Sequence, residues 1–263
     1  MIKPLVTVCI TTYNRAGLIK RTVDSIINQT YNNLEILIVD DCSSDNTENY
    51  IREFIVPLDK RIKYIKHKKN KGLASARNTA LNTCSGKYFT WCDDDDELLT
   101  NSIEERLRCF EARNNTYKDL VVVYTSCSII DNQLNRVTFQ NPEIQGLIED
   151  NVKEGRLSTI PSSGLYSVFL LKKIKGFDVD LKSFVDHDFW LKLSKNKFSA
   201  IGIEDPLTKT YYYRSKKSMV TDVSTRISVI EQFINKWSWY FKKIKGKNNT
   251  LTFLGNYRLR VIY

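Results

Sequence analysis

The fold is decided by residues 88–104, which read YFTWCDDDDELLTNSIE. The aromatic and apolar run at residues 88–92 predicts a buried strand, and four consecutive aspartates, Asp93 to Asp96, follow it directly. Asn101 then stands where a helix cap is expected, so a helix should follow the acidic run. A strand, an acidic loop and a helix in this order are typical of one unit of an α/β fold.

The first hundred residues repeat this alternation of strand and helix. Strands are predicted at residues 5–10, 34–39, 62–66 and 88–92, and helices at residues 18–27, from 45 onward and at 73–81. Successive units of this kind build a mostly parallel central sheet with helices on both faces, so we expect an α/β protein. The helix at residues 73–81 is expected to end at Ser85-Gly86 in a left-handed residue.

The second half of the chain has a different pattern. Longer β-like runs lie at residues 120–126, 136–139, 165–170, 198–203 and 208–214, and one helical stretch lies at residues 186–193. We therefore expect one domain of residues 1–215, with an alternating half (1–100) and a mixed half (101–215). Residues 216–263 follow it as a basic, aromatic and helical segment.

Composition narrows the class of protein. The chain has 263 residues, 42% of them hydrophobic, and 40 Lys and Arg against 30 Asp and Glu give a net charge of +10. This length and apolar fraction exclude a disordered chain, and the positive charge favours anionic partners. The six cysteines form no Cys-Xaa-Xaa-Cys pair and only two histidines are present, so no zinc-site spacing exists and a reducing cytoplasm is expected. Neither a signal peptide nor a run of about 18 apolar residues is expected from the sequence.

Two acidic clusters, Asp40-Asp41 and Asp93 to Asp96, each follow a predicted parallel strand. Ligands of open α/β sheets bind outside these strand ends. Adjacent carboxylates repel one another, and their hard oxygens favour Mg²⁺ or Mn²⁺, which often also holds a phosphate. The alternative for the aspartate run is a solvated helix N-terminus that binds nothing. The apolar pairs Trp91-Cys92 and Leu98-Leu99 on its two sides favour a rigid site.

Five short blocks, in one order and at familiar spacings, resemble a family 2 glycosyltransferase of the GT-A fold. The blocks are VTVCITTYNR (6–15), NQTY (28–31), IVDDCSSD (38–45), GLASARN (72–78) and DDDD (93–96). The resemblance covers roughly residues 4–215. It implies a nucleotide-sugar half at residues 1–100 and an acceptor half at residues 101–215.

The resemblance implies a donor site at the ends of the first strands. Thr11, Tyr13 and Asp41 would cradle the nucleotide base, with Tyr13 against the ring and Asp41 accepting from the uracil imide. Arg77 would approach the diphosphate. Taken one at a time, these residues have ordinary alternatives: a turn that carries Tyr13, and a surface salt bridge of Arg77.

The aspartate run matches the Asp-Xaa-Asp signature of the same family. In this resemblance Asp95 holds Mn²⁺ or Mg²⁺ between the two phosphates, while Asp93 and Asp94 contact the ribose and the sugar. The ion would stabilise the negative charge that grows on the departing diphosphate.

Residues 175–191, KGFDVDLKSFVDHDFWL, are similar to the acceptor-side motif of the family. The resemblance assigns to Asp186 the general base that takes the acceptor's proton, and burial beside aromatic side chains would raise its pKa. Val185 stands where the family usually has Glu. Asp188 competes for the role of base, and for both aspartates the alternative is capping of the helix that follows.

Residues 211–218, YYYRSKKS, are similar to a family segment that often has a His two residues after an Arg. Here Arg214 is that Arg, and Lys216 stands in the place of the His. Lys216 would offer a fixed positive charge to the leaving UDP; the alternative is a solvated basic loop.

The segment after Val223 interleaves aromatic residues with lysines, which is typical of a helix on an anionic membrane surface. The resemblance favours such a contact, because many acceptors of the family are lipid-linked. The alternative is that the aromatic residues pack on the domain while the lysines are solvated. The aromatic residues are Phe233, Trp237, Trp239, Tyr240 and Phe241.

Together, the residues and the resemblance predict a metal-dependent inverting glycosyltransferase. It would move a sugar from a UDP-sugar, or another nucleotide-sugar, to a hydroxyl of a saccharide or lipid-linked saccharide, in bacterial polysaccharide or glycolipid synthesis. We expect a cytoplasmic protein, with peripheral contact to the inner face of the plasma membrane if the tail binds lipid. The alternatives are a nucleotidyltransferase and an inactive sugar- or nucleotide-binding module. Nucleic acid is not an expected partner, because the basic residues accompany no reading motif.

Overall fold

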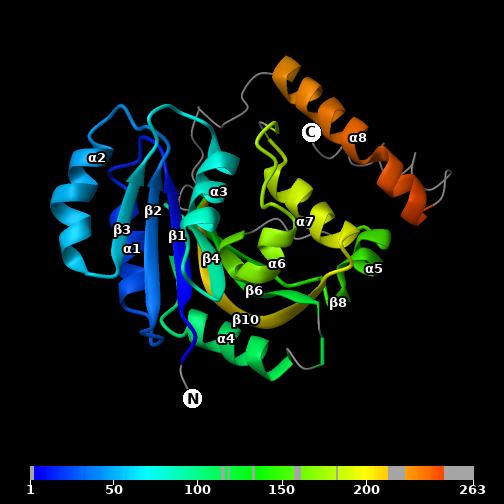
Figure 1. Ribbon diagram of the computed structural model, residues 1–263, viewed down its shortest axis with the longest axis horizontal. Helices are drawn as coiled ribbons and strands as arrows, with labels where there is room; N and C mark the ends of the chain where they lie inside the picture. The colour runs from blue at the N-terminus through cyan, green and yellow to red at the C-terminus, as the bar shows by residue number, and fades with distance from the viewer. Residues whose placement is uncertain are drawn as a thin grey trace.

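The first half of the chain forms a parallel sheet flanked by helices, as predicted (Figure 1). The structure is a computed structural model that describes residues 3–113, 116–117, 119–131, 134–156, 161–181, 183–212 and 223–245. Four strands pair in the order β3-β2-β1-β4, and all neighbours are parallel. They are β1 (Val6–Thr12), β2 (Leu34–Asp40), β3 (Ile62–Lys66) and β4 (Tyr88–Asp93).

Helices cover both faces of this sheet. Val8 and Ile10 of β1 pack in one core with α1 and α4, while Cys9 packs in a second core with α3. Alternate residues of a strand point to opposite faces, so burial on both faces explains the continuous apolar runs. The helices are α1 (Ile19–Ile27), α2 (Thr47–Tyr50) with the π-helical turn Ile51–Ile55 and the 3₁₀ turn Val56–Leu58 after it, α3 (Leu73–Thr83) and α4 (Ser102–Arg113).

The second half extends the same sheet with mixed pairing, in the order β4-β9-β6-β10-β5. β9 is antiparallel to both of its neighbours, whereas β6 and β10 run parallel to each other. The strands are β5 (Glu97–Leu98), β6 (Leu120–Asp131), β7 (Arg136–Gln140), β8 (Gly146–Leu147), β9 (Gly164–Ser167) and β10 (Ser199–Tyr212). The helices are α5 (Ile148–Lys153), α6 (Val168–Lys173) and α7 (Val185–Lys195).

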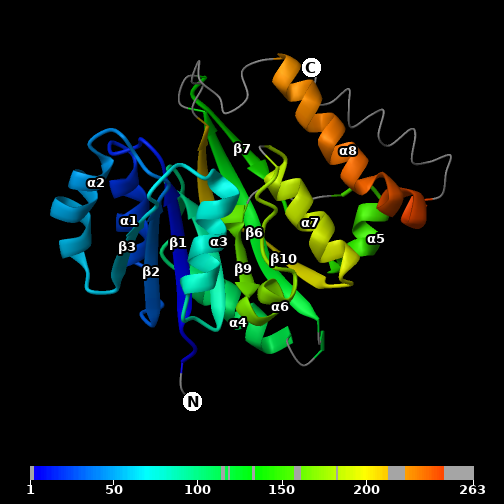
Figure 2. The same ribbon diagram turned by 45° about the horizontal axis from the view of Figure 1, so that its top comes forward.

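The predicted C-terminal helix is present as α8 (Val223–Lys245), which lies along α7 and α5 (Figure 2). Four of its five aromatic side chains are buried on the domain, and Trp239 is exposed. Tyr240 accepts a hydrogen bond from Ser194 of α7 and donates one to Glu149 of α5. Of the two alternatives for this segment, the described residues therefore show packing. Among the described helices, none combines the length and the apolar composition needed to cross a membrane.

The end of α3 differs from the prediction. Cys84 ends the helix in an extended conformation, and Gly86 does not have a positive φ. Gly86 is required for a different reason, because a Cβ there would lie 2.6 Å from Thr7 Oγ1 and 2.7 Å from Thr7 N. Glycine therefore allows the chain to pass close to β1 before β4 begins.

Two strand predictions in the second half are also corrected. The run at 165–170 was expected to be one strand, but only β9 is extended and α6 begins at Val168. The Ser167 side chain caps that helix by accepting from the Leu170 N–H at 3.5 Å. The runs 198–203 and 208–214 were expected as two strands, but residues 199–203 and 208–212 belong to the single strand β10, with register shifts around Pro206. Residues 213–214 lie outside the described residues.

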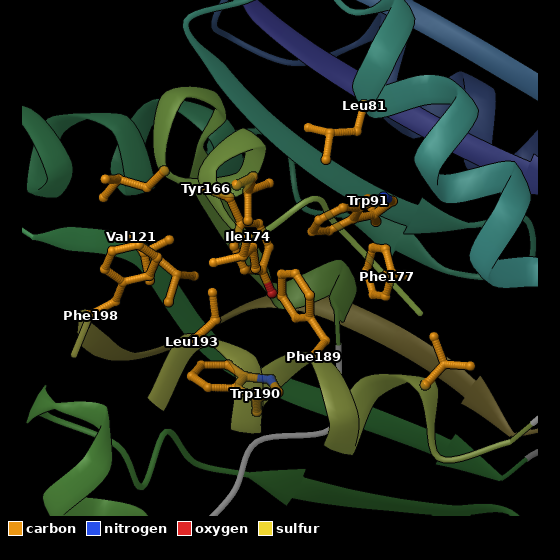
Figure 3. Packing of buried hydrophobic residues seen from close by; sticks show 14 of the residues in the cluster. Leu81, Trp91, Val121, Tyr166, Ile174, Phe177, Phe189, Trp190, Leu193 and Phe198 are labelled. Carbon is orange, nitrogen blue, oxygen red and sulfur yellow. The ribbon is translucent and has the colours of Figure 1, made fainter. Parts of the chain in front are cut away.

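An aromatic cluster joins β4 to α7 (Figure 3). The Trp91 ring lies edge-on to Tyr166, Phe177 and Phe189, at centroid distances of 4.8, 4.9 and 5.5 Å. Phe177 and Phe189 stack at 4.5 Å. Because Asp93 follows Trp91 closely and Asp186 precedes Phe189 by less than one helical turn, this cluster fixes the two acidic segments relative to each other.

Candidate active site

The loops that follow β1 and β2 are tied together at the carboxyl edge of the sheet. Asn14 adopts a left-handed conformation with a φ of 55°, and its side chain accepts from the Ser44 N–H at 2.8 Å. The Asn14 N–H donates to Ser43 Oγ at 2.9 Å. Thr11 is buried at the end of β1, whereas Tyr13 is 45% exposed. This exposure leaves the Tyr13 ring available for stacking, and the base-binding roles of both residues stay predictions.

Asp41 is buried and held by three donors. His67 Nδ1 lies 2.7 Å from Oδ1, the Lys71 N–H donates to the same oxygen at 2.9 Å, and the Gly72 N–H donates to Oδ2 at 2.6 Å. Gly72 has a φ of 85° and is the N-cap residue directly before α3. A carboxylate offers about four acceptor positions, so these donors leave one open on Oδ2 among the described residues. That position is free to accept from a ligand N–H.

The four aspartates form a turn whose carboxylates contact residues of several different elements, and Arg15 contacts two of them. Asp94 accepts from Thr12 Oγ1 at 2.7 Å, and Asp95 pairs with Arg15 Nη1 at 2.5 Å. Asp96 accepts from Ser162 Oγ at 2.6 Å, and the same Ser162 oxygen accepts from the Asp93 N–H at 3.2 Å. Ser162 is fully buried, so its hydrogen bonds fix the turn to the interior of the protein. Asp93 and Asp95 remain partly exposed to solvent.

Arg77 joins the aspartate turn to the acceptor-side motif. Its guanidinium donates to Asp186 Oδ1 at 2.6 Å and to Asp93 Oδ1 at 3.0 Å, and lies over the Phe177 ring at 5.3 Å. The side chain is 1% exposed. Burial alone would lower the pKa of Arg77, but the two carboxylates raise it above its ordinary value. The guanidinium of Arg77 thus lies between two carboxylates. Its approach to the diphosphate stays a prediction.

Asp186 itself lies at the mouth of a pocket. Burial raises its pKa, and the Arg77 charge opposes this rise. Its side chain remains 28% exposed, on the wall of a cavity of about 460 Å³ between the start of α3 and the loop before α7. The lining of that cavity includes the apolar Leu73, Val179 and Leu181 and the polar Lys71 and His187. A ligand in it would lie against the Asp186 carboxylate.

The family model described as "Glycosyl transferase family 2" matches residues 7–175 of this chain. The chain belongs to glycosyl transferase family 2. It is an enzyme of the glycosyltransferase class, as the sequence analysis predicted, and its sheet with flanking helices is the GT-A fold.

Two relatives of this family 2 glycosyltransferase show the extent of the similarity. An uncharacterized glycosyltransferase of Rickettsia prowazekii is 29% identical over 251 residues, which cover 92% of this chain and 73% of the relative. WfgD of Escherichia coli, named UDP-Glc:alpha-D-GlcNAc-diphosphoundecaprenol beta-1,3-glucosyltransferase, is 36% identical over 128 residues. That match covers 49% of this chain and 47% of WfgD.

Two solved structures share the fold. S. aureus TarS 1-349 in complex with UDP-GlcNAc matches with a TM-score of 0.65 and 21% identity, over 88% of this chain and 66% of that one. PcManGT from Pyrobaculum calidifontis, in complex with GDP-Man and Mn²⁺, matches with a TM-score of 0.67 and 19% identity over 99% of this chain and 72% of that one. The family 2 glycosyltransferase spans 40% of the longer TarS structure.

The donor set of this family 2 glycosyltransferase fits a divalent ion that shares its coordination with a ligand. Asp95 offers a partly exposed carboxylate, and hard oxygens of this kind suit Mn²⁺ and Mg²⁺. Within the described ranges, no three His, Cys, Asp or Glu side chains are grouped as a protein-only metal site requires. An ion bound at Asp95 therefore needs further oxygen ligands, such as phosphate and water.

Three residues in the site of this glycosyltransferase were missed from the sequence: Arg15, His67 and Ser162. Arg15 follows β1 within the first block, and His67 directly follows β3. Residues that follow the carboxyl ends of parallel strands often lie in the ligand site, so these positions could have marked both residues as candidates. Ser162 had no local signal, since it reaches the aspartate turn from 66 positions along the chain. Arg214 and Lys216 lie outside the described residues.

Asp188 points away from the cavity, into the interface between α7 and α8. It is fully buried, accepts from Trp237 Nε1 at 2.8 Å and pairs with Lys236 Nζ at 2.5 Å. This placement favours Asp186 as the base, because Asp188 is enclosed by α8.

Replacing Asp188 with alanine should therefore lower stability without lowering catalysis. The Trp237 N–H would lose its acceptor, which costs about 1–3 kcal/mol. Urea unfolding and the kcat of the folded enzyme are the measurements, with the exposed Asp180→Ala as the matched control. A fall in kcat as large as that of an Asp186 variant would instead make Asp188 the base.

Burial raises the pKa of Asp94 to about 7, although the Arg15 charge and the Thr12 hydrogen bond oppose the rise. The carboxyl of an unfolded chain titrates near pH 4, so the folded state binds more protons between about pH 4 and pH 7. Asp94 thus supports folding below pH 4, and this contribution is lost as the pH rises through 7.

The stability of the Asp94→Asn variant relative to the wild type should consequently rise between pH 4 and pH 8, by at most about 4 kcal/mol at about 1.4 kcal/mol per pKa unit. Urea unfolding at both pH values checks this. A stability difference that is the same at pH 4 and at pH 8 would contradict it.

Proposed function

We propose that this enzyme transfers a sugar from a UDP-sugar to an acceptor hydroxyl, with inversion at the anomeric carbon. The observation that carries the proposal is the bridge made by Arg77, whose one guanidinium contacts both Asp93 and Asp186. These carboxylates come from the donor-side signature and from the acceptor-side motif. The proposed donor site and the proposed acceptor site therefore lie next to each other, with Arg77 between them. Direct transfer requires such proximity of the two substrates.

Asp186 is the general base of the reaction. Its carboxylate is partly exposed to the cavity, within which an acceptor hydroxyl can approach it. Burial raises its pKa above that of a free aspartate, and a base with a raised pKa takes a proton more readily. The deprotonated oxygen attacks the anomeric carbon from the face opposite the nucleotide. One displacement of this kind inverts the configuration and needs no covalent intermediate.

The donor is held at the strand ends by Thr11, Tyr13 and Asp41, with Asp93 and Asp94 at the ribose and the sugar. Asp41 has one acceptor position open, which suits the imide N–H of uracil. UDP-GlcNAc is the ligand of one structural neighbour and UDP-Glc stands in the name of WfgD, which supports a uridine donor. GDP-Man in PcManGT makes guanosine the first alternative to test.

Mn²⁺ or Mg²⁺ bound at Asp95 would supply positive charge to the leaving diphosphate. The Mn²⁺ in PcManGT supports a divalent ion in this fold. Asp95 serves as its carboxylate ligand, and Thr12 orients the neighbouring Asp94 by donating to it. Arg214 and Lys216 are further candidates for contact with the leaving group.

The acceptor is a saccharide or a lipid-linked saccharide of bacterial polysaccharide or glycolipid synthesis. The diphosphoundecaprenol acceptor in the name of WfgD supports this class. On α8, Trp239, Lys242 and Lys243 remain exposed and are available to an anionic lipid surface. The protein thus acts in the cytoplasm, with peripheral contact to the membrane that holds its acceptor.

A donor panel tests the proposal. Purified protein is incubated with UDP-, GDP- and dTDP-sugars plus Mn²⁺, with and without EDTA, and release of nucleoside diphosphate is measured. We expect release from a UDP-sugar that EDTA and Asp95→Asn abolish, while the exposed Asp150→Asn control retains it. Pyrophosphate release would indicate a nucleotidyltransferase. If the protein neither releases a nucleoside diphosphate nor binds nucleotide in a metal-dependent way, the donor site is wrong and the protein is a different binding module.

A further inference from the structure

Arg15 stands over the aspartate turn on a fixed stretch of backbone. The backbone N–H of Arg15 donates to Thr47 Oγ1 at 3.0 Å. The preceding residue, Asn14, has a left-handed conformation that directs the chain toward the four aspartates. The position of the Arg15 Cα is therefore set by hydrogen bonds that do not involve the Arg15 side chain. The guanidinium can leave the turn without any change in the backbone.

That guanidinium makes charge-assisted hydrogen bonds to two carboxylates. A single nitrogen, Nη1, lies 2.5 Å from Asp95 Oδ2 and 3.3 Å from Asp94 Oδ1. One positive charge thus occupies the space between two carboxylates, one of which is the proposed metal ligand. A hard divalent ion at Asp95 would seek the same oxygens.

Arg15 differs from Arg77 in how firmly it is held. Arg77 is 1% exposed and is enclosed by the aromatic cluster, so its bridge is a permanent part of the site. Arg15 is 44% exposed, and ion pairs with one solvated partner are weak and easily exchanged. The pair between Arg15 and Asp95 is therefore the one that an incoming ion can replace.

We propose that Arg15 is an internal counter-ion that competes with the divalent ion for Asp95 and moves to the donor's diphosphate when the ion binds. In the absence of donor, the ion must separate Arg15 from its carboxylates, which weakens ion binding. When a nucleoside diphosphate is present, the displaced guanidinium gains phosphate oxygens as new partners. Ion and nucleotide therefore strengthen each other's binding, by the same factor in both directions. The inference rests on the proposed role of Asp95.

Mn²⁺ binding tests this directly, without any turnover. The free Mn²⁺ signal in electron paramagnetic resonance is titrated with protein at pH 8, with and without UDP. We expect Arg15→Gln to bind Mn²⁺ alone at least about fivefold more tightly than the wild type, and the enhancement by UDP to fall by a similar factor. Arg15→Lys keeps the charge and should resemble the wild type.

The matched control is Lys20→Gln, which removes one positive charge from the surface of α1. Lys20 is 52% exposed and pairs with Asp24 rather than with the aspartate turn. Mn²⁺ affinity that is unchanged or lower in Arg15→Gln, or raised equally in Lys20→Gln, would overturn the proposal. Wild-type Mn²⁺ binding that UDP does not strengthen would overturn the coupling.

Asp95→Asn separates this inference from the function on which it rests. If Asp95→Asn weakens Mn²⁺ binding but Arg15→Gln does not tighten it, only the role of Arg15 is wrong. If Asp95→Asn leaves Mn²⁺ binding unchanged, the ion site of the proposed function is itself misplaced. Thermal melts of each variant confirm that it is folded.

Discussion

The Asp186→Asn variant is expected to lower kcat for sugar transfer by about 10²–10⁴-fold, with little change in the KM for the donor. Asparagine preserves the size of the side chain but cannot accept the acceptor's proton. The loss should fall mainly on kcat, because Asp186 is proposed to act on the acceptor hydroxyl and not to bind the nucleotide.

Steady-state kinetics with the sugar donor found in the panel measures this change. Asp180→Asn, on the exposed loop before α7, serves as the control for the loss of one carboxylate. An Asp186→Asn variant that transfers sugar within about tenfold of the wild-type rate would rule out Asp186 as the base.

The Arg77→Met variant should damage stability and catalysis together. Methionine fills much of the space over Phe177 but leaves Asp93 and Asp186 without their shared cation. The two carboxylates left behind are 36% and 28% exposed, so the loss should be about 1–3 kcal/mol, less than the ~3–5 kcal/mol of a fully buried ion pair. Urea unfolding measures this loss, and Arg108→Met, which removes a 76% exposed guanidinium, should change stability by less than about 1 kcal/mol.

The pH dependence of kcat/KM in Arg77→Met should shift in one direction. Arg77 lowers the pKa of Asp186, so its removal should raise that pKa and delay ionisation of the base to higher pH. The acidic limb of the kcat/KM profile should then move to higher pH in Arg77→Met. Arg77→Lys, which keeps the charge but reaches fewer oxygens, should show a smaller shift. An unmoved limb in Arg77→Met would show that Arg77 does not act through Asp186.

The first half of the fold could be predicted because its sequence is periodic. Runs such as residues 34–39 are apolar except for Glu35, since they are buried on both faces, and each is separated from the next by a helix signal. The apolar run at 165–170 is too short for periodicity to distinguish strand from helix. There Ser167 ends β9 and caps α6, and its side chain accepts from the Leu170 N–H at 3.5 Å.

The individual carboxylates of the site could be named from the order of the blocks, but their pairing could not. Arg77 contacts Asp186 across 109 positions of sequence, and Ser162 contacts Asp96 across 66. Such pairs depend on how the two halves of the sheet meet at β4 and β9. The sequence could not distinguish Asp186 from Asp188 for the same reason. Only the packing of α8 on α7 shows that Asp188 is the one that is covered.

The burial of α8 limits which segments can be exchanged between members of this family in a chimera. Phe233, Trp237, Tyr240 and Phe241 share one hydrophobic core with α5 and α7, and α7 also carries the proposed base. A chimera that takes residues 223–245 from another member must also take the matching faces of α5 and α7, or it will leave cavities in this shared core. These three helices therefore have to be exchanged as one packing unit.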